Sequence, residues 1–195
     1  MGSVRSATWY DQRFAQPDSK YLWRAEDLPY YHLWQLAIGH MKDGDVVVDL
    51  GCGPGHLAEL ATRRRAVRYR GYDFSAQALS MARKRAPEAA FFLWDATKDP
   101  VPRPSRTRTV YVSTEFMEHV EDDLGIIRQI PAGALTILTV PARDDPGHVR
   151  HFKTIDEVRK RYAPLLEIVD LQRYEARHWK AGAVWYFLAG TRKAT

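Results

Sequence analysis

The sequence predicts an α/β fold: a seven-stranded, mostly parallel sheet with helices on both faces and an antiparallel last strand. Three observations predict it. From residue 45 onward there are seven short apolar runs, and helical patterns alternate with the first five of them. A glycine-rich turn directly follows the first run, and no helix-length segment separates the last two. Alternation of strands and helices requires right-handed crossovers and therefore parallel strands, whereas a hairpin-like link reverses the final strand.

Apolar periodicity, together with capping and stop signals, gives the expected elements. Strands are expected at residues 45–50, 67–72, 89–94, 109–113, 134–140, 165–171 and 183–191. One helix follows the first strand, a second begins at an N-capping Ser75 and ends at Pro87, and a third carries the apolar stripe of residues 124–130. Thr154 to Glu157 form a capping box that opens a fourth.

The length indicates one domain, residues 1–195, because a chain of 195 residues can bury a continuous core without crosslinks. Residues 45–195 form the expected core. Residues 1–44 are rich in aromatic side chains, and their apolar spacing predicts a helix over residues 28–41. We expect residues 1–44 to cover the ligand as a helical lid, with ordinary helix core as the alternative. The aromatic residues that we expect to stack on a substrate are Tyr10, Tyr30, Tyr31 and His32.

The composition favours a protein of the reducing cytoplasm. Cys52 is the single cysteine, which excludes an internal disulfide. No apolar run approaches the roughly 20 residues of a membrane helix, and we expect no secretory signal. The net charge is +5, with arginine and lysine grouped around residues 63–70, 83–85 and 103–108. These groups indicate either a solvated face or an RNA or phosphorylated partner.

The turn after the first expected strand, Asp49-Leu50-Gly51-Cys52-Gly53-Pro54-Gly55, lies at the carboxyl edge of the sheet, where open α/β sheets bind ligands. Gly51 and Gly53 let a ligand approach the main chain closely. A dinucleotide fingerprint would place glycine at position 56, which is His56 here. No Gly-Lys-Ser/Thr ends the turn, so a P-loop is excluded as well.

Two later acids stand at the ends of the next two expected strands. Asp73 comes 24 residues after Asp49, at the place from which a carboxylate accepts hydrogen bonds from both hydroxyls of a ribose. Asp95 ends the third strand, where it would accept the amino proton of an adenine. Each acid alone would be an ordinary surface or capping residue. Together with the glycine turn, they predict a site for an adenosine-containing ligand.

Val46 to Gly55, Gly71-Tyr72-Asp73-Phe74-Ser75 and Trp94-Asp95-Ala96 resemble motifs one to three of the class I, Rossmann-like methyltransferases that use S-adenosylmethionine. The resemblance covers most of the chain and implies seven strands with the last antiparallel. It also implies that Asp49 and Gly51 hold the methionine end of the cofactor, Asp73 the ribose and Asp95 the adenine. The cofactor-contacting residues expected on this basis are Asp49, Gly51, Gly53, Gly55, Asp73, Phe74, Asp95, Ala96 and Thr114.

A second group of polar residues follows the fourth expected strand. In a helical turn, Glu115, Glu118 and His119 would share one face. Their spacing resembles that of ubiquinone-biosynthesis O-methyltransferases and small-RNA 2′-O-methyltransferases, in which such groups hold a divalent ion. On that resemblance, His148 or His151 completes the set. Two carboxylates with imidazole suit manganese, iron or zinc, and the resemblance also admits magnesium.

The alternative is that no metal binds, that Glu118 and His119 cap a helix and contact the substrate, and that His119 is the general base. A metal would instead lower the pKa of an acceptor hydroxyl. Both hypotheses favour methyl transfer to an oxygen of a small molecule. RNA 2′-O-methylation and a non-catalytic cofactor-binding partner of another protein are the two alternatives. The sequence leaves the acceptor and the oligomeric state open.

Overall fold

The computed structural model describes residues 4–104, 108–176 and 182–194. The strands are β1 Val46–Leu50, β2 Arg68–Asp73, β3 Ala90–Leu93, β4 Thr109–Thr114, β5 Leu135–Pro141, β6 Leu166–Glu175 and β7 Val184–Arg192. The helices are α1 Ala7–Ala15, α2 Tyr31–Gly39, α3 His56–Arg64, α4 Ala76–Arg85, α5 Asp123–Gln129 and α6 Ile155–Tyr162. Three short 3-10 helices are η1 Lys20–Leu22, η2 Ala25–Asp27 and η3 Met117–His119.

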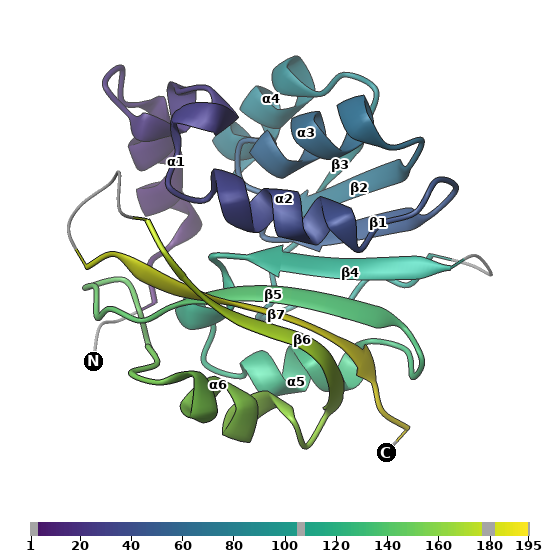
Figure 1. Cartoon of the computed structure of the whole chain (residues 1–195). Coiled ribbons are helices and arrows are strands. Elements are labelled where there is room, and N and C mark those ends of the chain that lie inside the picture. The colour runs from purple at the N-terminus through teal and green to yellow at the C-terminus, as the bar shows by residue number, and fades with distance from the viewer. Residues whose placement is uncertain (1–3, 105–107, 177–181, 195) are drawn as a thin grey trace.

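The strands form one sheet in the order β3-β2-β1-β4-β5-β7-β6 (Figure 1). β1 to β5 pair in parallel, whereas β7 runs antiparallel to both β5 and β6. The predicted seven-stranded sheet with an antiparallel last strand is therefore confirmed. The strand order reverses between β1 and β4, and the loops after these strands meet at the same carboxyl edge.

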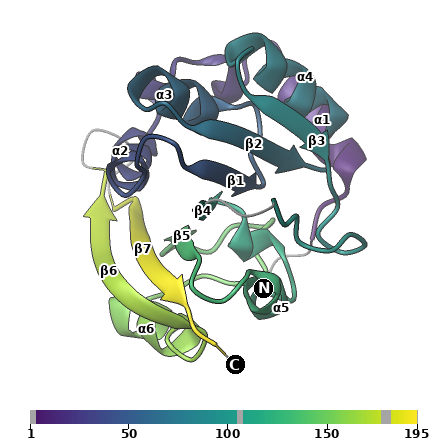
Figure 2. The ribbon, with the colours of Figure 1, turned by 90° about the vertical axis from the view of Figure 1, so that its right-hand side faces the viewer.

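Helices cover both faces of the sheet, as predicted. Figure 2 shows α2, α3 and α4 along one face and α5 and α6 along the other. A buried apolar core lies on each side: Val47, Leu57 and Phe187 belong to the first, and Tyr111 and Ile127 to the second. Adjacent strand residues point to opposite faces, so the buried side chains of β1 contribute to both cores.

Local capping interactions fix the helix starts. The Ser75 hydroxyl accepts a hydrogen bond from the Ala78 amide, which confirms the predicted cap of α4. At α6, the Thr154 hydroxyl accepts from the Glu157 amide, and the Glu157 carboxylate accepts from the Lys153 amide. The predicted boundary at Thr154 is therefore confirmed.

Two predicted boundaries were wrong. The helix predicted over residues 28–41 spans only Tyr31–Gly39, because Leu28 precedes a proline and is extended, with a ψ of 146°. The strand predicted over residues 165–171 continues to Glu175, where it pairs with Val184 of β7. Hairpin pairing extends this strand through polar residues that an apolar pattern does not detect. Among the described residues, no helix has the length and apolar character to cross a membrane.

The N-terminal helix α1 lies against the carboxyl edge of the sheet. The Asp11 carboxylate accepts hydrogen bonds from the Ser75 hydroxyl and the Gln77 amide, at the first turn of α4. Beside it, the Tyr10 ring contacts Phe74 at 5.5 Å and His119 at 6.0 Å between ring centroids. The first helix therefore covers the loops that follow β2 and β4.

Candidate functional site

The glycine turn after β1 has the backbone geometry that its sequence predicts. Gly51, Gly53 and Gly55 have φ values of 78°, 51° and 81°, in the left-handed region that favours glycine. The amides of Gly51 and Cys52 both donate to the Tyr72 carbonyl, at 2.8 and 3.0 Å. A Cβ atom at position 51 would clash with the Phe116 ring. The turn is therefore held against β2, with an aromatic ring closing one side of it.

Asp73, at the end of β2, lies directly against this turn. Its carboxylate accepts hydrogen bonds from the Gly53 amide at 2.8 Å and from the Ser75 amide at 2.9 Å. The side chain is buried, and burial raises its pKa to about 6 despite these hydrogen bonds. Each carboxylate oxygen has a second lone pair, so both can still accept a ligand hydroxyl.

Asp49 lies beneath the turn, with one oxygen satisfied and one not. The Tyr69 hydroxyl donates to Oδ2 at 2.5 Å, whereas Oδ1 is buried and has no hydrogen-bond partner among the described residues. Burial raises the pKa of Asp49 to about 7, although the Tyr69 hydrogen bond opposes this shift. A buried carboxylate oxygen without a partner is costly, and a cationic donor from a ligand would satisfy it.

The other expected cofactor residues lie around the same edge with mixed orientation. Asp95 turns toward its own loop, where it accepts from Thr97 and, at 2.7 Å, from Lys98 Nζ. Burial alone would raise the pKa of Asp95, but these hydrogen bonds outweigh it, and the pKa is lowered. Thr114 accepts a hydrogen bond from the Trp34 indole, and Ala96 packs against the second apolar core. The polar side chains of Asp95 and Thr114 are therefore already bonded to protein groups.

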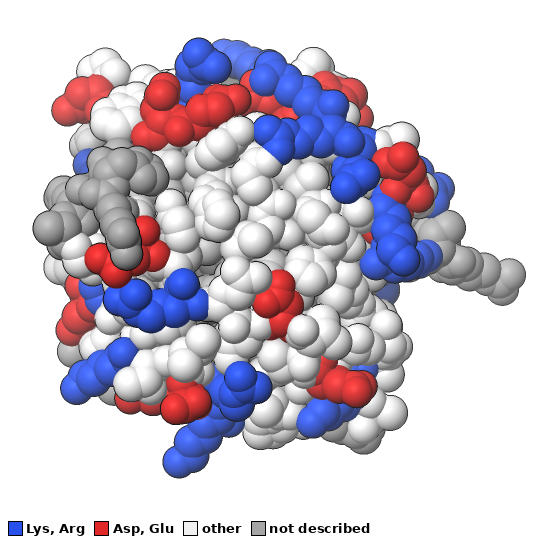
Figure 3. All heavy atoms as spheres, viewed as in Figure 1, with Lys and Arg blue, Asp and Glu red and all other residues white. Residues whose placement is uncertain are grey.

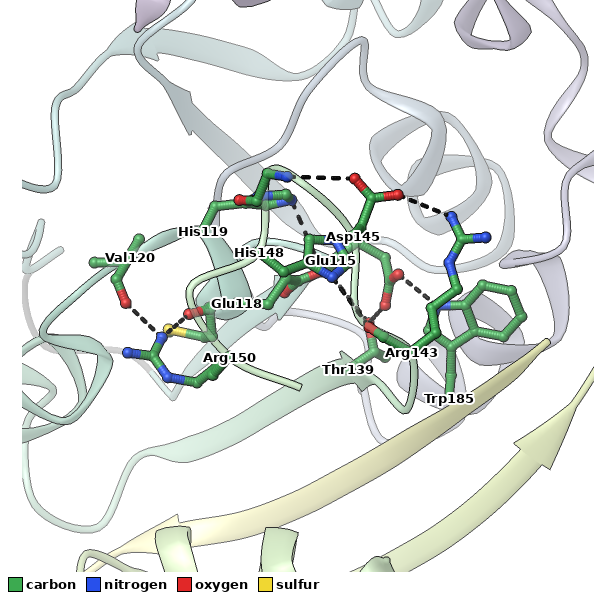
Figure 4. A network of polar contacts seen from close by, with 12 residues as sticks. Glu115, Glu118, His119, Val120, Thr139, Arg143, Asp145, His148, Arg150 and Trp185 are labelled. Atoms are coloured by element: carbon green, nitrogen blue, oxygen red, sulfur yellow. Dashed lines mark hydrogen bonds and ion pairs between the residues drawn. The ribbon is translucent and has the colours of Figure 1, made fainter. Parts of the chain in front are cut away.

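A second polar cluster, made of Glu118, His119 and His148, lies next to this edge (Figure 4). One potential ligand atom of each residue lies within 4.8 Å of the others. The two imidazole rings are 4.9 Å apart, and His119 Nε2 is 3.9 Å from Glu118 Oε1. Glu118 is buried, and neither of its carboxylate oxygens has a hydrogen-bond partner among the described residues.

The hydrogen bonds of the two histidines fix which nitrogen is free. Nδ1 of His119 lies 2.8 Å from the Gly147 carbonyl, and Nδ1 of His148 lies 3.3 Å from the Arg143 carbonyl. A carbonyl only accepts, so each Nδ1 carries the proton and each Nε2 keeps its lone pair. Burial lowers the pKa of both histidines, which keeps them neutral. Burial also raises the pKa of Glu118 to about 8.

Glu115 does not join this cluster, so the predicted shared helical face was wrong. The residue directly follows β4 and has a φ of 56°, and the 3-10 helix η3 begins only at Met117. The Glu115 carboxylate instead accepts hydrogen bonds from the Thr139 hydroxyl at 3.0 Å and from the Trp185 indole. Burial, followed by the Glu118 charge, raises its pKa to about 8. Figure 4 shows its side chain directed toward Trp185.

The sequence left two histidines open as the last member of the cluster. The structure brings His148 to His119, whereas His151 lies 3.7 Å from the Asp144 carboxylate. Three contacts near the site were missed altogether: Tyr69 on Asp49, Trp185 on Glu115, and Asp11 on Ser75. Each joins residues at least 20 positions apart, and no motif spacing encodes such pairs.

Comparison with known proteins finds similarity to methyltransferases. Residues 47–131 match the family model described as a methyltransferase domain. The trans-aconitate 2-methyltransferase of Paracidovorax citrulli (strain AAC00-1) is 34% identical over 108 residues, which cover 52% of this chain and 41% of that protein. The ubiquinone biosynthesis O-methyltransferase of Vibrio campbellii (strain ATCC BAA-1116) is 34% identical over 122 residues, 61% of this chain and 47% of that protein. The chain thus spans less than half the length of these two relatives.

Solved structures share the fold at low sequence identity. A putative methyltransferase in complex with the Trm112 methyltransferase activator of Haloferax volcanii has a TM-score of 0.73 at 16% identity, covering 98% of this chain and 100% of that one. The N-methyltransferase NodS of Bradyrhizobium japonicum, solved with S-adenosylhomocysteine, has a TM-score of 0.67 at 16% identity, covering 96% and 98%.

The residues present fit the cofactor of this family. The left-handed turn leaves room for a ligand at Gly53, where an added Cβ would meet no atom within 4 Å. Asp49 offers an unpartnered buried oxygen for an ammonium, and Asp73 offers acceptors for ribose hydroxyls. The match over residues 47–131 and the seven-stranded sheet together support a class I, Rossmann-like methyltransferase domain, of the kind that uses S-adenosylmethionine as cofactor.

Proposed function

We propose that this chain transfers a methyl group from S-adenosylmethionine to a hydroxyl oxygen of a small-molecule acceptor, and that His119 and Glu118 act on that oxygen. The observation that carries the proposal is the free Nε2 of His119 beside the buried, unpartnered Glu118 carboxylate. Tyr10 contacts both His119 and Phe74. Phe74 directly follows Asp73, the proposed ribose ligand, so His119, the proposed base, lies next to the cofactor edge.

When bound, S-adenosylmethionine supplies a methyl group on a positively charged sulfur that is already activated for transfer. The protein must then align the acceptor, exclude water and take up the hydroxyl proton. His119 is suited to the last task, because its neutral imidazole keeps a lone pair on Nε2.

We propose that residues 1–195 form one domain in which residues 1–44 are the lid. Contacts of Tyr10 and Asp11 across the carboxyl edge support this.

We propose Asp49, Asp73 and the turn of Gly51, Gly53 and Gly55 as the principal cofactor ligands. Phe74, Asp95, Ala96 and Thr114 border the same edge, and we propose them as its outer contacts. Asp49 would receive the ammonium of the methionine end on its unpartnered Oδ1. Asp73 would receive the ribose hydroxyls.

A divalent cation held by Glu118, His119 and His148 is the second mechanism that we propose for the same reaction. Its support is a donor set in which one ring nitrogen of each histidine and a carboxylate oxygen lie within 4.8 Å of one another, while backbone carbonyls orient both imidazoles through Nδ1. This nitrogen and oxygen donor set suits manganese, iron or zinc, and magnesium less well. The ion would lower the pKa of the acceptor hydroxyl. Glu115 lies outside this donor set, bound to Thr139 and Trp185.

The relatives favour a small molecule over RNA, since their names give trans-aconitate and ubiquinone biosynthesis. In Figure 3, lysine and arginine side chains lie in separate groups around a mostly uncharged centre that includes an acidic group, and further acidic side chains lie beside the basic ones. Arg106, one of the basic residues noted in the sequence, lies outside the described residues. RNA methylation stays a prediction without a specific observation behind it. We also propose a cytoplasmic location, because Cys52 is the single cysteine and a reducing compartment suits such a chain.

The direct test is transfer of label from methyl-tritiated S-adenosylmethionine to a series of hydroxylated aromatic acids, with trans-aconitate, which has carboxylates and no hydroxyl group, as the comparison acceptor. We expect labelled ether product together with S-adenosylhomocysteine from the hydroxylated acids, whereas label on trans-aconitate alone would contradict transfer to a hydroxyl. Binding of S-adenosylhomocysteine without transfer to any acceptor would favour the non-catalytic partner hypothesis. No heat of binding for S-adenosylhomocysteine in calorimetry would contradict the proposed cofactor site itself.

Cofactor affinity is expected to rise with pH between about 5.5 and 8, by up to about tenfold per pH unit below the pKa of the carboxyl concerned. Burial raises the pKa of Asp49 to about 7 and that of Asp73 to about 6, so both carboxyls are partly protonated at the start of this range. The ligand ammonium requires ionised Asp49, and binding must therefore release a proton. Asp49→Asn is expected to flatten the upper part of the profile.

Calorimetry with S-adenosylhomocysteine in buffers of different ionisation enthalpy measures the released proton directly. Asp95→Asn is the matched control. In the wild-type protein, hydrogen bonds lower the pKa of Asp95 against the opposing effect of burial, so this carboxyl stays ionised between about pH 5.5 and 8. That variant is expected to keep the slope. A pH-independent affinity in the wild-type protein would show that Asp49 does not receive the ammonium.

A further inference from the structure

Lys20 is a partly buried cation with an unusual shortage of acceptors. Its ammonium lies over the rings of Tyr21 and Tyr30, 5.5 and 5.2 Å from their centroids, and donates one hydrogen bond of 2.9 Å to the Tyr30 hydroxyl. Among the described residues, no carboxylate forms an ion pair with it. An ammonium has three N–H donors, so two remain for a ligand.

Charged side chains of both signs surround Lys20. Burial lowers the pKa of Lys20, and Arg143 and Arg13 lower it further, while Glu115 and Asp145 oppose the shift. Arg13 donates a hydrogen bond to the neutral Gln16 side chain, and Arg143 forms an ion pair with Asp145 at 3.3 Å. The Glu115 carboxyl accepts hydrogen bonds from Thr139 and Trp185, so it does not supply the acceptors that Lys20 lacks.

Aromatic contacts join Lys20 to the proposed site of methyl transfer. Tyr30, its hydrogen-bond partner, packs on Trp185 at 5.5 Å and on Trp34 at 5.8 Å between ring centroids. The indole of Trp185 donates to Glu115, and that of Trp34 donates to Thr114, both at the end of β4. Figure 4 shows Trp185 and Arg143 on one side of Glu115, with His119 and His148 on the other. Lys20 is thus a single aromatic layer away from the β4 edge.

We propose that Lys20 binds an anionic group of the methyl acceptor, so that the substrate is an organic acid whose carboxylate is separate from its nucleophilic oxygen. This inference rests on the proposed function. A partly buried ammonium with one neutral partner is less favourable than a paired one, and a carboxylate would supply both the countercharge and the missing acceptors. The tyrosine rings beside it would line the path of an aromatic or unsaturated acid.

The test uses benzoate and the uncharged benzamide, which are matched in shape, together with citrate as an aliphatic anion. In the presence of saturating S-adenosylhomocysteine, calorimetry gives the dissociation constants of all three. We expect the wild-type protein to bind the two anions about tenfold more tightly than benzamide, because a hydrogen bond between two charged groups is stronger than one to a neutral acceptor. Lys20→Met is expected to remove that preference, and Lys20→Arg to retain most of it. Lys84→Met, at an exposed position of α4, is the matched control and is expected to bind as the wild type does.

The outcomes separate this inference from the function on which it rests. Equal binding of benzoate and benzamide by the wild-type protein would overturn the anion site without reference to any variant. Undiminished anion binding by Lys20→Met would overturn it as well. Affinity for S-adenosylhomocysteine is measured separately, since none of the hydrogen bonds of Lys20 reaches the glycine turn. If the wild-type protein does not bind that ligand, the proposed function fails; if it does and no anion preference is seen, only the inference fails.

Discussion

Replacing His119 with alanine is expected to lower the turnover of a hydroxyl-bearing acceptor by about 100-fold or more, since a positioned acid or base contributes roughly 10²- to 10⁴-fold. The affinity for S-adenosylhomocysteine is expected to stay unchanged. The contacts of His119 are with Glu118, His148, Tyr10 and the Gly147 carbonyl, and none is with the glycine turn. Steady-state rates and calorimetry on the same preparation measure the two effects.

His151→Ala is the matched control for this variant. His151 follows the same strand as His148 but lies beside Asp144, outside the cluster. It is expected to turn over at the wild-type rate. Wild-type turnover by His119→Ala would remove both proposed roles of this residue, base and metal ligand. The pH profile adds a second readout: burial lowers the pKa of His119 below its ordinary 6.5, so a base at this position stays active in mildly acidic buffer.

The same variants separate a general base from a metal ligand. If His119 acts as the base, a chelator leaves the rate unchanged and His148→Ala is mild, because His148 then only packs against the reacting group. If the cluster holds an ion, dialysis against a chelator abolishes turnover, manganese restores it, and His148→Ala is as damaging as His119→Ala. Spectroscopic titration of manganese into wild-type protein and Glu118→Gln shows directly whether that carboxylate binds the ion.

The sequence predicted the fold and the cofactor edge because both depend on local patterns. β1 and its turn are encoded by a continuous apolar run followed by three glycines, and each of these glycines has the left-handed φ that its position requires. Asp73 meets the turn because the carboxyl ends of neighbouring parallel strands lie side by side. Periodicity and parallel topology alone were enough to predict that these residues lie at the same edge of the sheet.

The part of the site beyond β4 depended on long-range contacts that no local pattern describes. Glu115 has helical spacing relative to Glu118, but Glu115 itself has a left-handed backbone conformation after β4. Its carboxylate accepts a hydrogen bond from Trp185 of β7. The choice of His148 over His151 depends on how the loop after β5 folds back onto η3. There the Gly147 carbonyl bonds to His119, and the Val149 amide donates to the Glu118 carbonyl. Lys20 looks like an ordinary surface lysine until the tyrosines around it are seen.

The largest loss of stability is expected from Gly55→Ala. Gly55 caps α3 with a φ of 81°, and an added Cβ would lie 2.9 Å from both Cα and Cβ of Ala82 in α4. A left-handed conformation costs an alanine about 1–2 kcal/mol, and overpacking a tight contact adds about 1–3 kcal/mol. The sum is about 3 kcal/mol, or a fall of roughly 6–12 °C in Tm for a protein of this size.

Gly44→Ala separates the backbone cost from the packing cost. Gly44 has a φ of 87°, but an added Cβ there would meet no atom within 4 Å. Only the backbone penalty of about 1–2 kcal/mol is expected for it. Urea unfolding of both variants therefore isolates the helix contact. If Gly55→Ala loses no more stability than Gly44→Ala, α3 and α4 do not approach as closely as described, and the start of α3 that follows the cofactor turn is less constrained than its backbone angles indicate.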